Sequence, residues 1–244
     1  MVRSFDRSNK GIYEDIYSTP GHKKYYVVSD VLENFVSKAG QHIEILKLEE
    51  FGPSLFIDSE LQVAEKDEKK YSGQFVGSAL NLSKNNSSAA IIGGGDGGVA
   101  RELSSKGFDL IDWYELDPEV VKVCQKHLLK VCGDIKANNK VKTYWGDAFE
   151  IIKKVKDSKY DKIFVDLNDD QFCIDLAAKN MRGLKRILKP GGIITAQVGC
   201  MSKKPRQVRN WLELLKNNFG NVTLDEIFIP SFDCRWNFAS SVMK

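Results

Sequence analysis

The amino-acid sequence predicts an α/β protein in which a small antiparallel β module precedes a mostly parallel, seven-stranded sheet of Rossmann-like type. The first observation behind this prediction is the alternation of short apolar segments with helical segments after residue 88, which is typical of parallel sheets covered by helices on both faces. The second is the segment 89–102, where an apolar run enters a glycine cluster and then a helical sequence. This succession of strand, turn and helix is typical of nucleotide-binding sites.

The length of 244 residues suits one main domain with a small additional module. We expect residues 1–75 to form an N-terminal segment with a β-hairpin module, and residues 76–244 to form the Rossmann-like domain. The formal net charge is +3, and the lysines are spread along the chain. This distribution disfavours nucleic acid as a partner, because proteins that bind it usually concentrate their basic residues on one face.

The five cysteines are an odd number without Cys-x-x-Cys spacing, so we expect reduced thiols rather than zinc ligands or a disulfide framework. The N-terminus lacks an apolar signal segment, and no apolar stretch approaches the length of a membrane span. We therefore expect a soluble cytoplasmic protein with no membrane partner.

The expected elements follow in order. Residues 1–24 are polar with a turn signal at Pro20-Gly21, and we expect at most partial order there. Residues 24–65 contain short alternating segments separated by hairpin signals at 51–53 and 58–59, and a helix is expected at 67–82. The strands of the main sheet are expected at 89–92, 110–116, 141–145, 162–167, 193–198, 222–229 and 237–242. Its helices are expected at 99–106, 119–131, 149–156, 174–188 and 206–217.

Acidic residues follow four successive strands of the predicted sheet. Asp96 lies in the glycine turn after the first strand, Glu115 ends the second, and Asp147 follows the third. Asp166 ends the fourth strand, and Asp169 follows it closely. Ligands of open parallel sheets bind beyond the carboxyl ends of the strands, so these carboxylates predict a binding site there. Because turns of this kind usually bind anions, the carboxylate of Asp96 indicates a ligand that carries a cation.

Each acid also has a purely structural interpretation. Glu115 has the position of a ribose acceptor but could be a solvated acid at a strand end. Asp147 could accept a hydrogen bond from an adenine amine or cap the following helix. Asp166 and Asp169 could hold a polyamine-like cation and accept a proton, whereas a helix cap is favoured for Asp170. Metal binding is disfavoured because no histidine lies near these acids in the sequence.

The segments 91–98, 115–117, 146–148 and 160–166 together resemble the polyamine aminopropyltransferases, the spermidine and spermine synthases. The similarity extends from about residue 12 to the C-terminus. That family transfers an aminopropyl group from decarboxylated S-adenosylmethionine to an amine and releases methylthioadenosine. The resemblance therefore implies a methyltransferase-type Rossmann-like sheet, a polyamine substrate, decarboxylated S-adenosylmethionine as co-substrate, no permanently bound cofactor and a homodimer.

The resemblance also implies roles for individual residues. Asp96 would bind the donor's ammonium and repel the carboxylate of ordinary S-adenosylmethionine. Asp166 would orient and deprotonate the attacking amine together with Tyr71, since a protonated amine has no lone pair. Asp169 would hold the acceptor's distal cation, and Phe232 stands near the acceptor. The implied donor-binding residues are Gln41, Gln62, Gly93, Gly95, Asp96, Glu115 and Asp147.

The sequence departs from the family at the acceptor side. Residues 166–170 differ from the usual Asp-Ser-Ser-Asp-Pro, residues 171–174 replace a Gly-Pro segment, and Phe232 replaces a tyrosine. Spermidine formation from putrescine is the favoured activity, followed by spermine formation from spermidine. Two alternatives stay open: an N-methyltransferase that uses ordinary S-adenosylmethionine, and a non-catalytic homologue that assembles with an active partner.

Overall fold

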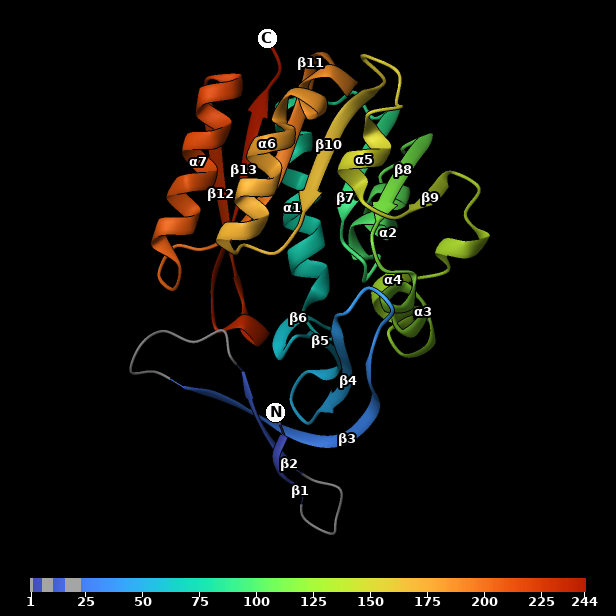
Figure 1. Ribbon diagram of the computed structural model, residues 1–244, viewed down its shortest axis with the longest axis vertical. Helices are drawn as coiled ribbons and strands as arrows, with labels where there is room; N and C mark the ends of the chain where they lie inside the picture. Colours follow the sequence, from blue (N-terminus) through green and yellow to red (C-terminus); the bar gives the residue numbers. More distant parts are fainter. Residues whose placement is uncertain (1, 6–10, 16–22) are drawn as a thin grey trace.

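The computed structural model describes residues 2–5, 11–15 and 23–244, which form two sheets with flanking helices (Figure 1). The smaller sheet is six-stranded and antiparallel, and its strands lie in chain order. The predicted turn at Pro20-Gly21 lies outside the described residues. The strands of the small sheet are β1 (Val2–Phe5), β2 (Gly11–Asp15), β3 (Lys24–Val36), β4 (His42–Leu48), β5 (Gly52–Ile57) and β6 (Glu60–Ala64).

The larger sheet has the order β12-β13-β11-β10-β7-β8-β9. Five strands are parallel neighbours, while β13 runs antiparallel to both β11 and β12. The predicted seven-stranded, mostly parallel sheet preceded by an antiparallel module is therefore confirmed. The strands are β7 (Ser88–Gly93), β8 (Leu110–Glu115), β9 (Val141–Trp145), β10 (Tyr160–Asp166), β11 (Leu188–Cys200), β12 (Val222–Ile229) and β13 (Cys234–Val242).

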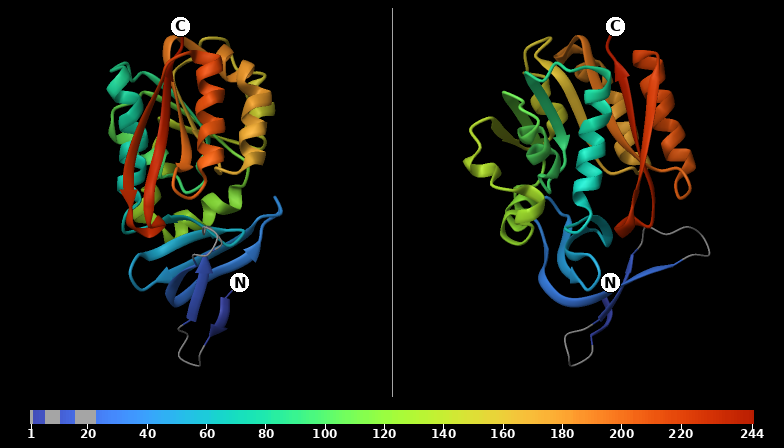
Figure 2. Two further views of the ribbon diagram at one scale, coloured as in Figure 1. Left: turned by 90° about the vertical axis from the view of Figure 1, so that its left-hand side faces the viewer. Right: turned by 180° about the vertical axis from the view of Figure 1, so that it is seen from behind.

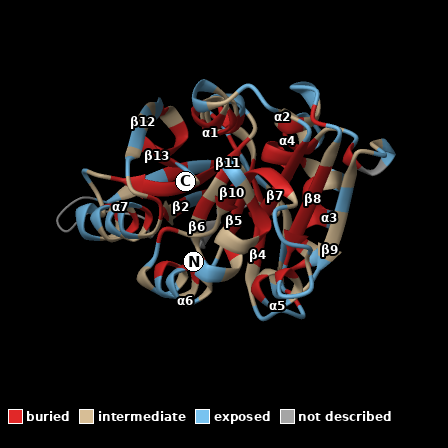
Figure 3. Cartoon of the chain, turned by 90° about the horizontal axis from the view of Figure 1, so that it is seen from above, coloured by how far each residue is buried: buried red, intermediate tan, exposed pale blue. Residues whose placement is uncertain are grey.

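Helices cover both faces of the large sheet (Figure 2). Helices α1 and α2 pack on one face, and α5, α6 and α7 pack on the other, so that β7, β10 and β11 are buried between them (Figure 3). Within the described ranges, no helix has the length and apolar character needed to cross a membrane. The helices are α1 (Glu68–Leu82), α2 (Gly98–Ser105), α3 (Pro118–His127), α4 (Leu129–Cys132), α5 (Ala148–Ile152), α6 (Gln171–Ile187) and α7 (Pro205–Phe219), with 3-10 turns η1 (Ile135–Ala137) and η2 (Pro230–Phe232).

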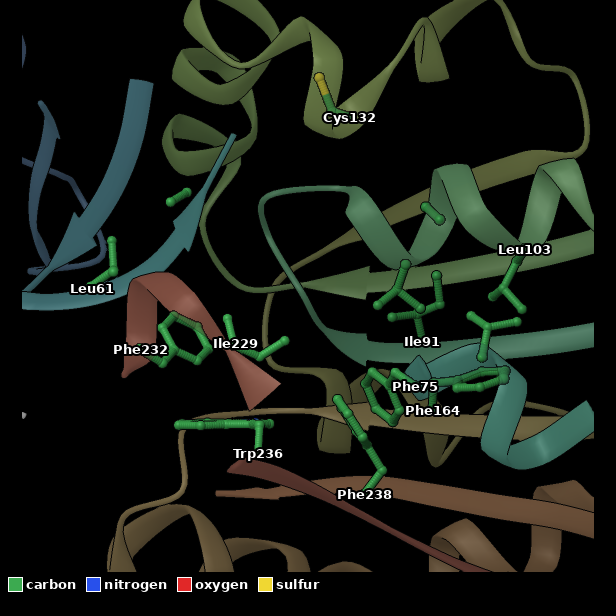
Figure 4. Close-up of a cluster of buried hydrophobic side chains, with 14 of the residues drawn as sticks. Leu61, Phe75, Ile91, Leu103, Cys132, Phe164, Ile229, Phe232, Trp236 and Phe238 are labelled. Carbon is green, nitrogen blue, oxygen red and sulfur yellow. The ribbon is translucent and has the colours of Figure 1, made fainter. Parts of the chain in front are cut away.

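An aromatic cluster fixes α1 against the large sheet (Figure 4). Phe75 of α1 stacks on Phe238 of β13 with ring centroids 4.9 Å apart and meets Phe164 of β10 edge-on at 5.5 Å. All three side chains are fully buried, and burial of one such ring stabilises a fold by about 1.5–3 kcal/mol. The cluster therefore holds the first turns of α1, including Tyr71, close to the end of β10.

Three predicted segments differ from the structure. Residues 2–5 and 11–15 form strands, because 11–15 pair with β3 and 2–5 pair with 11–15, which supplies order that their polar sequence does not predict. The helix predicted at 119–131 breaks at Leu128, whose side chain is buried against the small sheet. The helix predicted at 149–156 ends at Ile152, where the guanidinium of Arg186 donates to the carbonyls of Ile152 and Val155 at 2.7 and 2.6 Å. Helix α1 spans the expected domain boundary at residues 75 and 76, and that division stays a prediction.

Candidate active site

A cavity of about 580 Å³ lies where the small sheet meets the carboxyl ends of β7, β8 and β10. Figure 1 shows the small sheet facing this edge of the large sheet. Segments far apart in the sequence therefore contribute to one cavity, and every site residue that the sequence predicts lines it. These residues are Gln41, Gln62, Tyr71, Gly93, Gly95, Asp96, Glu115, Asp147, Asp166, Asp169 and Phe232.

The glycine turn after β7 lies directly against the end of β10. Gly94 has a φ of +71°, and its N–H donates to the carbonyl of Asp166 at 3.0 Å. A Cβ atom at Gly94 would lie 2.8 Å from Asp166 Oδ2, and one at Gly95 would lie 3.3 Å from Glu115 Oε2. Glycine is therefore needed here both for the backbone conformation and for the close approach of two carboxylates.

Replacing Gly94 with alanine should impair the protein more than replacing Gly107. Both glycines have positive φ, but a Cβ atom at Gly107 would have no neighbour within 4 Å. Gly107→Ala should therefore cost only the backbone strain of about 1–2 kcal/mol. Gly94→Ala should cost more and displace Asp166, which lowers turnover. Chemical denaturation and turnover would be measured for both variants, and equal losses would contradict this account.

Asp96 is half-buried in a cluster of acids at the glycine turn. Its Oδ1 accepts a hydrogen bond from the Gly98 N–H at 2.6 Å. Burial, followed by the carboxylates of Asp166 and Glu68, raises the pKa of Asp96 well above its usual value. Arg101 lies behind the cluster and binds Glu68 with an Nη1 to Oε2 distance of 2.5 Å. A ligand cation beside Asp96 would favour the charged form of this carboxyl, because an opposite charge offsets the free-energy cost of removing the carboxylate from water.

Glu115 and Asp147 have structural contacts and also line the cavity. Glu115 is buried, and its Oε1 accepts from the Asp117 N–H at 2.9 Å. Burial raises the pKa of Glu115 to about 7. Asp147 caps α5 by accepting from the Phe149 N–H at 2.8 Å, so the cap interpretation is confirmed. Both side chains also line the cavity, so both can contact a ligand there.

Tyr71 and Asp166 form the hydrogen-bonded pair at the centre of the cavity. Tyr71 Oη donates to Asp166 Oδ1 at 2.7 Å, and the ring of Tyr71 lies edge-on to Phe232 at 6.2 Å. Burial raises the pKa of Asp166 to about 6, although the hydrogen bond from Tyr71 acts in the opposite direction. A carboxylate with this pKa is ionised at neutral pH and can accept a proton from a ligand, so the pair suits general-base chemistry.

Aromatic and amide side chains form the wall beyond this pair. Phe232 and Trp236 lie with ring centroids 4.7 Å apart, and both line the cavity (Figure 4). Gln197 accepts from Trp236 Nε1 at 3.1 Å and donates through its own Nε2 to the carbonyl of Leu167. An apolar ligand chain with charged ends fits such a wall, since its methylene groups can lie against the rings.

Several residues of the site have no counterpart in the sequence-based prediction. Glu68 lies one helical turn before Tyr71, and this spacing was the available signal for it. Glu60, Gln197 and Trp236 line the cavity, and Lys204 binds Asp169. No sequence motif indicates a role in the site for these four residues. Asp170 caps α6 by accepting from the Cys173 N–H at 2.7 Å, which confirms its predicted role.

No metal site is evident in the described part of the chain, where no group of three or more His, Cys, Asp or Glu side chains is placed to hold an ion. The cavity's carboxylates instead lie near lysine, tyrosine and backbone N–H groups.

Comparisons with known proteins agree with this geometry. The family model described as "Spermine/spermidine synthase domain" matches residues 68–244. A polyamine aminopropyltransferase from Prochlorococcus marinus (strain MIT 9215) is 32% identical over 218 residues, covering 84% of this chain and 76% of that protein. A polyamine aminopropyltransferase from Korarchaeum cryptofilum (strain OPF8) is 27% identical and covers 87% of this chain and 67% of that protein.

Two solved structures share the fold of the whole chain. A crystal structure of spermidine synthase in complex with the transition state analogue AdoDATO has a TM-score of 0.87, covering 100% of this chain and 82% of that one. Spermidine synthase from Thermotoga maritima has a TM-score of 0.85 with the same coverage. Both are 19% identical to this chain, so they are similar in fold.

Proposed function

The chain belongs to the spermine/spermidine synthase family, and from this membership we propose that it transfers an aminopropyl group from decarboxylated S-adenosylmethionine to a polyamine acceptor. The observation that carries the proposal is the 2.7 Å hydrogen bond between Tyr71 and Asp166, in a cavity that also contains Asp96 and Glu115. A proton acceptor and a set of donor-binding acids thus occur together.

In the proposed reaction, the acceptor nitrogen forms a bond to the aminopropyl carbon attached to sulfur. The carbon–sulfur bond breaks, and its electron pair goes to the sulfonium, which leaves as the neutral thioether of methylthioadenosine. Asp166 accepts the proton that the nitrogen loses, with Tyr71 holding its carboxylate in place. Because a sulfonium is already a good leaving group, alignment of nitrogen with carbon supplies most of the remaining acceleration.

Asp96 supports the decarboxylated donor over ordinary S-adenosylmethionine. A carboxylate that lies beside those of Asp166 and Glu68 favours an ammonium and repels a further carboxylate. Gln41, Gln62, Glu115 and Asp147 would contact the nucleoside, and glycines of the turn would let it approach the backbone. The N-methyltransferase alternative requires the opposite preference, so stronger thermal stabilisation by ordinary S-adenosylmethionine would favour that alternative.

For the acceptor, we propose putrescine first and spermidine second. Asp169 would hold the distal ammonium, and Phe232 would contact the methylene chain. The test is to incubate the isolated chain with the decarboxylated donor and a panel of diamines and triamines, and to identify products by mass spectrometry. Methylthioadenosine and an extended amine are expected, which would also rule out obligatory inactivity. Absence of methylthioadenosine with every amine would end the proposal.

We also propose a homodimer that forms through the outer face of β2 and β3. Ile12 and Val27 are cross-strand partners, and they are 53% and 50% exposed; Tyr25, on the same face, is 52% exposed. Light scattering should give twice the chain mass of 27.5 kDa, which is about 55 kDa. Val27→Lys should shift the protein toward the monomer, since a charge in the centre of an apolar interface is poorly tolerated. A wild-type mass near that of one chain would contradict the dimer.

A further inference from the structure

A lysine lies between the two acids at the acceptor end of the cavity. Lys204, which precedes α7, binds Asp169 with an Nζ to Oδ1 distance of 3.0 Å and Glu60 with an Nζ to Oε1 distance of 3.4 Å. Glu60 comes from β6, and Asp169 follows β10, so the three side chains join the small sheet to the large one. Both acids line the cavity.

The three charged side chains are largely shielded from solvent, so their net charge affects how tightly a charged ligand binds. Asp169 is only 3% exposed, and the side chains of Lys204 and Glu60 are 25% and 19% exposed. Burial raises the pKa of Glu60 to about 7, Lys204 acts in the opposite direction, and Asp169 raises it again. A cationic ligand group nearby would favour the charged form of Glu60, because it adds a second positive neighbour.

Other charged groups around this end of the cavity contribute less. Lys203 donates to the carbonyl of Phe232 at 2.8 Å, and Lys24 donates to the carbonyl of Ser231, so both side chains are directed to backbone oxygens. Asp58 and Asp170 line the cavity but are exposed, and solvent screens their charges. Asp15 is buried beyond the cavity wall, where it accepts from the hydroxyl of Tyr26 at 3.2 Å.

Building on the proposed function, we propose that Lys204 determines how many positive charges the acceptor carries beyond its attacking nitrogen. With the Glu60 carboxyl in the charged form that a ligand ammonium favours, Glu60 and Asp169 supply two negative charges and Lys204 supplies one positive charge. One net negative charge then remains to pair with the acceptor. A diamine with one nitrogen at Asp166 has one ammonium left, which matches this charge. A triamine has two, and the second would lie unpaired near Lys204, where like charges repel in a poorly solvated site.

The test uses binding, so it does not depend on turnover. Calorimetry would measure the affinities of putrescine and spermidine in the presence of methylthioadenosine, for the wild type and four variants. The wild type should bind the diamine more tightly. Lys204→Gln should raise the ratio of spermidine to putrescine affinity at least about tenfold, which corresponds to about 1.4 kcal/mol. Glu60→Gln should weaken binding of putrescine, because no net negative charge remains.

The double variant Glu60→Gln/Lys204→Gln restores one negative charge and should regain the wild-type preference for the diamine. This compensation separates a charge effect from a loss of packing, which two substitutions would only worsen. Lys140→Gln is the matched control, since Lys140 pairs with the exposed Asp109 at the opposite edge of the sheet. It should leave the affinity ratio unchanged.

The inference fails if Lys204→Gln changes the affinity ratio by less than about twofold. It also fails if the double variant keeps the altered affinity ratio of Lys204→Gln, or if the wild type binds neither amine. A protein that shows the expected affinities but produces no methylthioadenosine would instead contradict the proposed function while supporting the role of Lys204.

Discussion

Asp166→Asn should lower the turnover number by about 10²- to 10⁴-fold while leaving the affinity for methylthioadenosine nearly unchanged. The asparagine keeps the size of the side chain and an oxygen that can accept from Tyr71 Oη, now 2.7 Å from Asp166 Oδ1. It cannot accept the proton that the attacking amine loses. The turnover number would be measured with saturating donor and acceptor, and the nucleoside affinity by calorimetry.

Two controls accompany this variant. Asp109→Asn removes an exposed acid at the opposite edge of the sheet and should leave turnover unchanged. Tyr71→Phe removes the hydrogen bond but keeps the carboxylate of Asp166. The turnover number of this variant should therefore fall by only about ten- to a hundredfold. If Asp166→Asn abolished nucleoside binding and retained turnover at high donor concentration, Asp166 would belong to the donor site instead.

The same carboxylate predicts the acid limb of the pH profile. Because burial raises the pKa of Asp166 to about 6, the fraction of enzyme with an ionised base falls as the pH drops through this value. The ratio kcat/KM should therefore decrease about tenfold for each pH unit below 6. In Asp166→Asn this limb should disappear, and its persistence would assign the titration to another group.

Asp96→Asn should weaken binding of decarboxylated S-adenosylmethionine by about ten- to a hundredfold, the range expected for loss of a charge-assisted hydrogen bond. The asparagine oxygen can still accept from the Gly98 N–H, which Asp96 Oδ1 contacts at 2.6 Å, so the glycine turn should keep its conformation. The affinity for ordinary S-adenosylmethionine should rise or stay constant, because the repelled carboxylate no longer faces a negative charge. Discrimination between the two donors should therefore decrease.

Calorimetry with both nucleosides measures this discrimination, and methylthioadenosine serves as a reference because it lacks the charged chain. Its affinity should not differ between the wild type and Asp96→Asn. An equal loss for all three nucleosides would mean that the substitution distorts the turn after β7. An unchanged ratio between the two donors would remove Asp96 from ammonium recognition.

The central part of the fold could be predicted because local patterns determine it. The apolar run before Gly93 and the acids at successive strand ends require only short-range information and the rule that parallel strands end at one edge. The sequence predicts a turn at Gly94, but the contact of Gly94 with Asp166 depends on β7 and β10 being neighbours in the sheet.

The remaining features depend on partners that are distant in the sequence. Lys204 is 144 residues from Glu60 and gives no local signal of an ion pair with it. The break at Leu128 follows from burial against the small sheet, and the order of residues 11–15 follows from pairing with β3. Tertiary contacts override local propensity at these positions.

The amide of Gln197 has a consequence for any attempt to redesign acceptor preference. Its oxygen accepts from the indole of Trp236 on β13, while its NH₂ group donates to the carbonyl of Leu167, the residue after Asp166. Only one orientation of the amide satisfies both partners. Gln197 therefore holds in place both Trp236 of the aromatic wall and the backbone next to Asp166. Replacing Trp236 to enlarge the pocket would therefore also loosen the support of Asp166. A wider acceptor range would be gained together with slower chemistry, unless a new hydrogen-bond donor to the Gln197 amide oxygen is introduced in the same step.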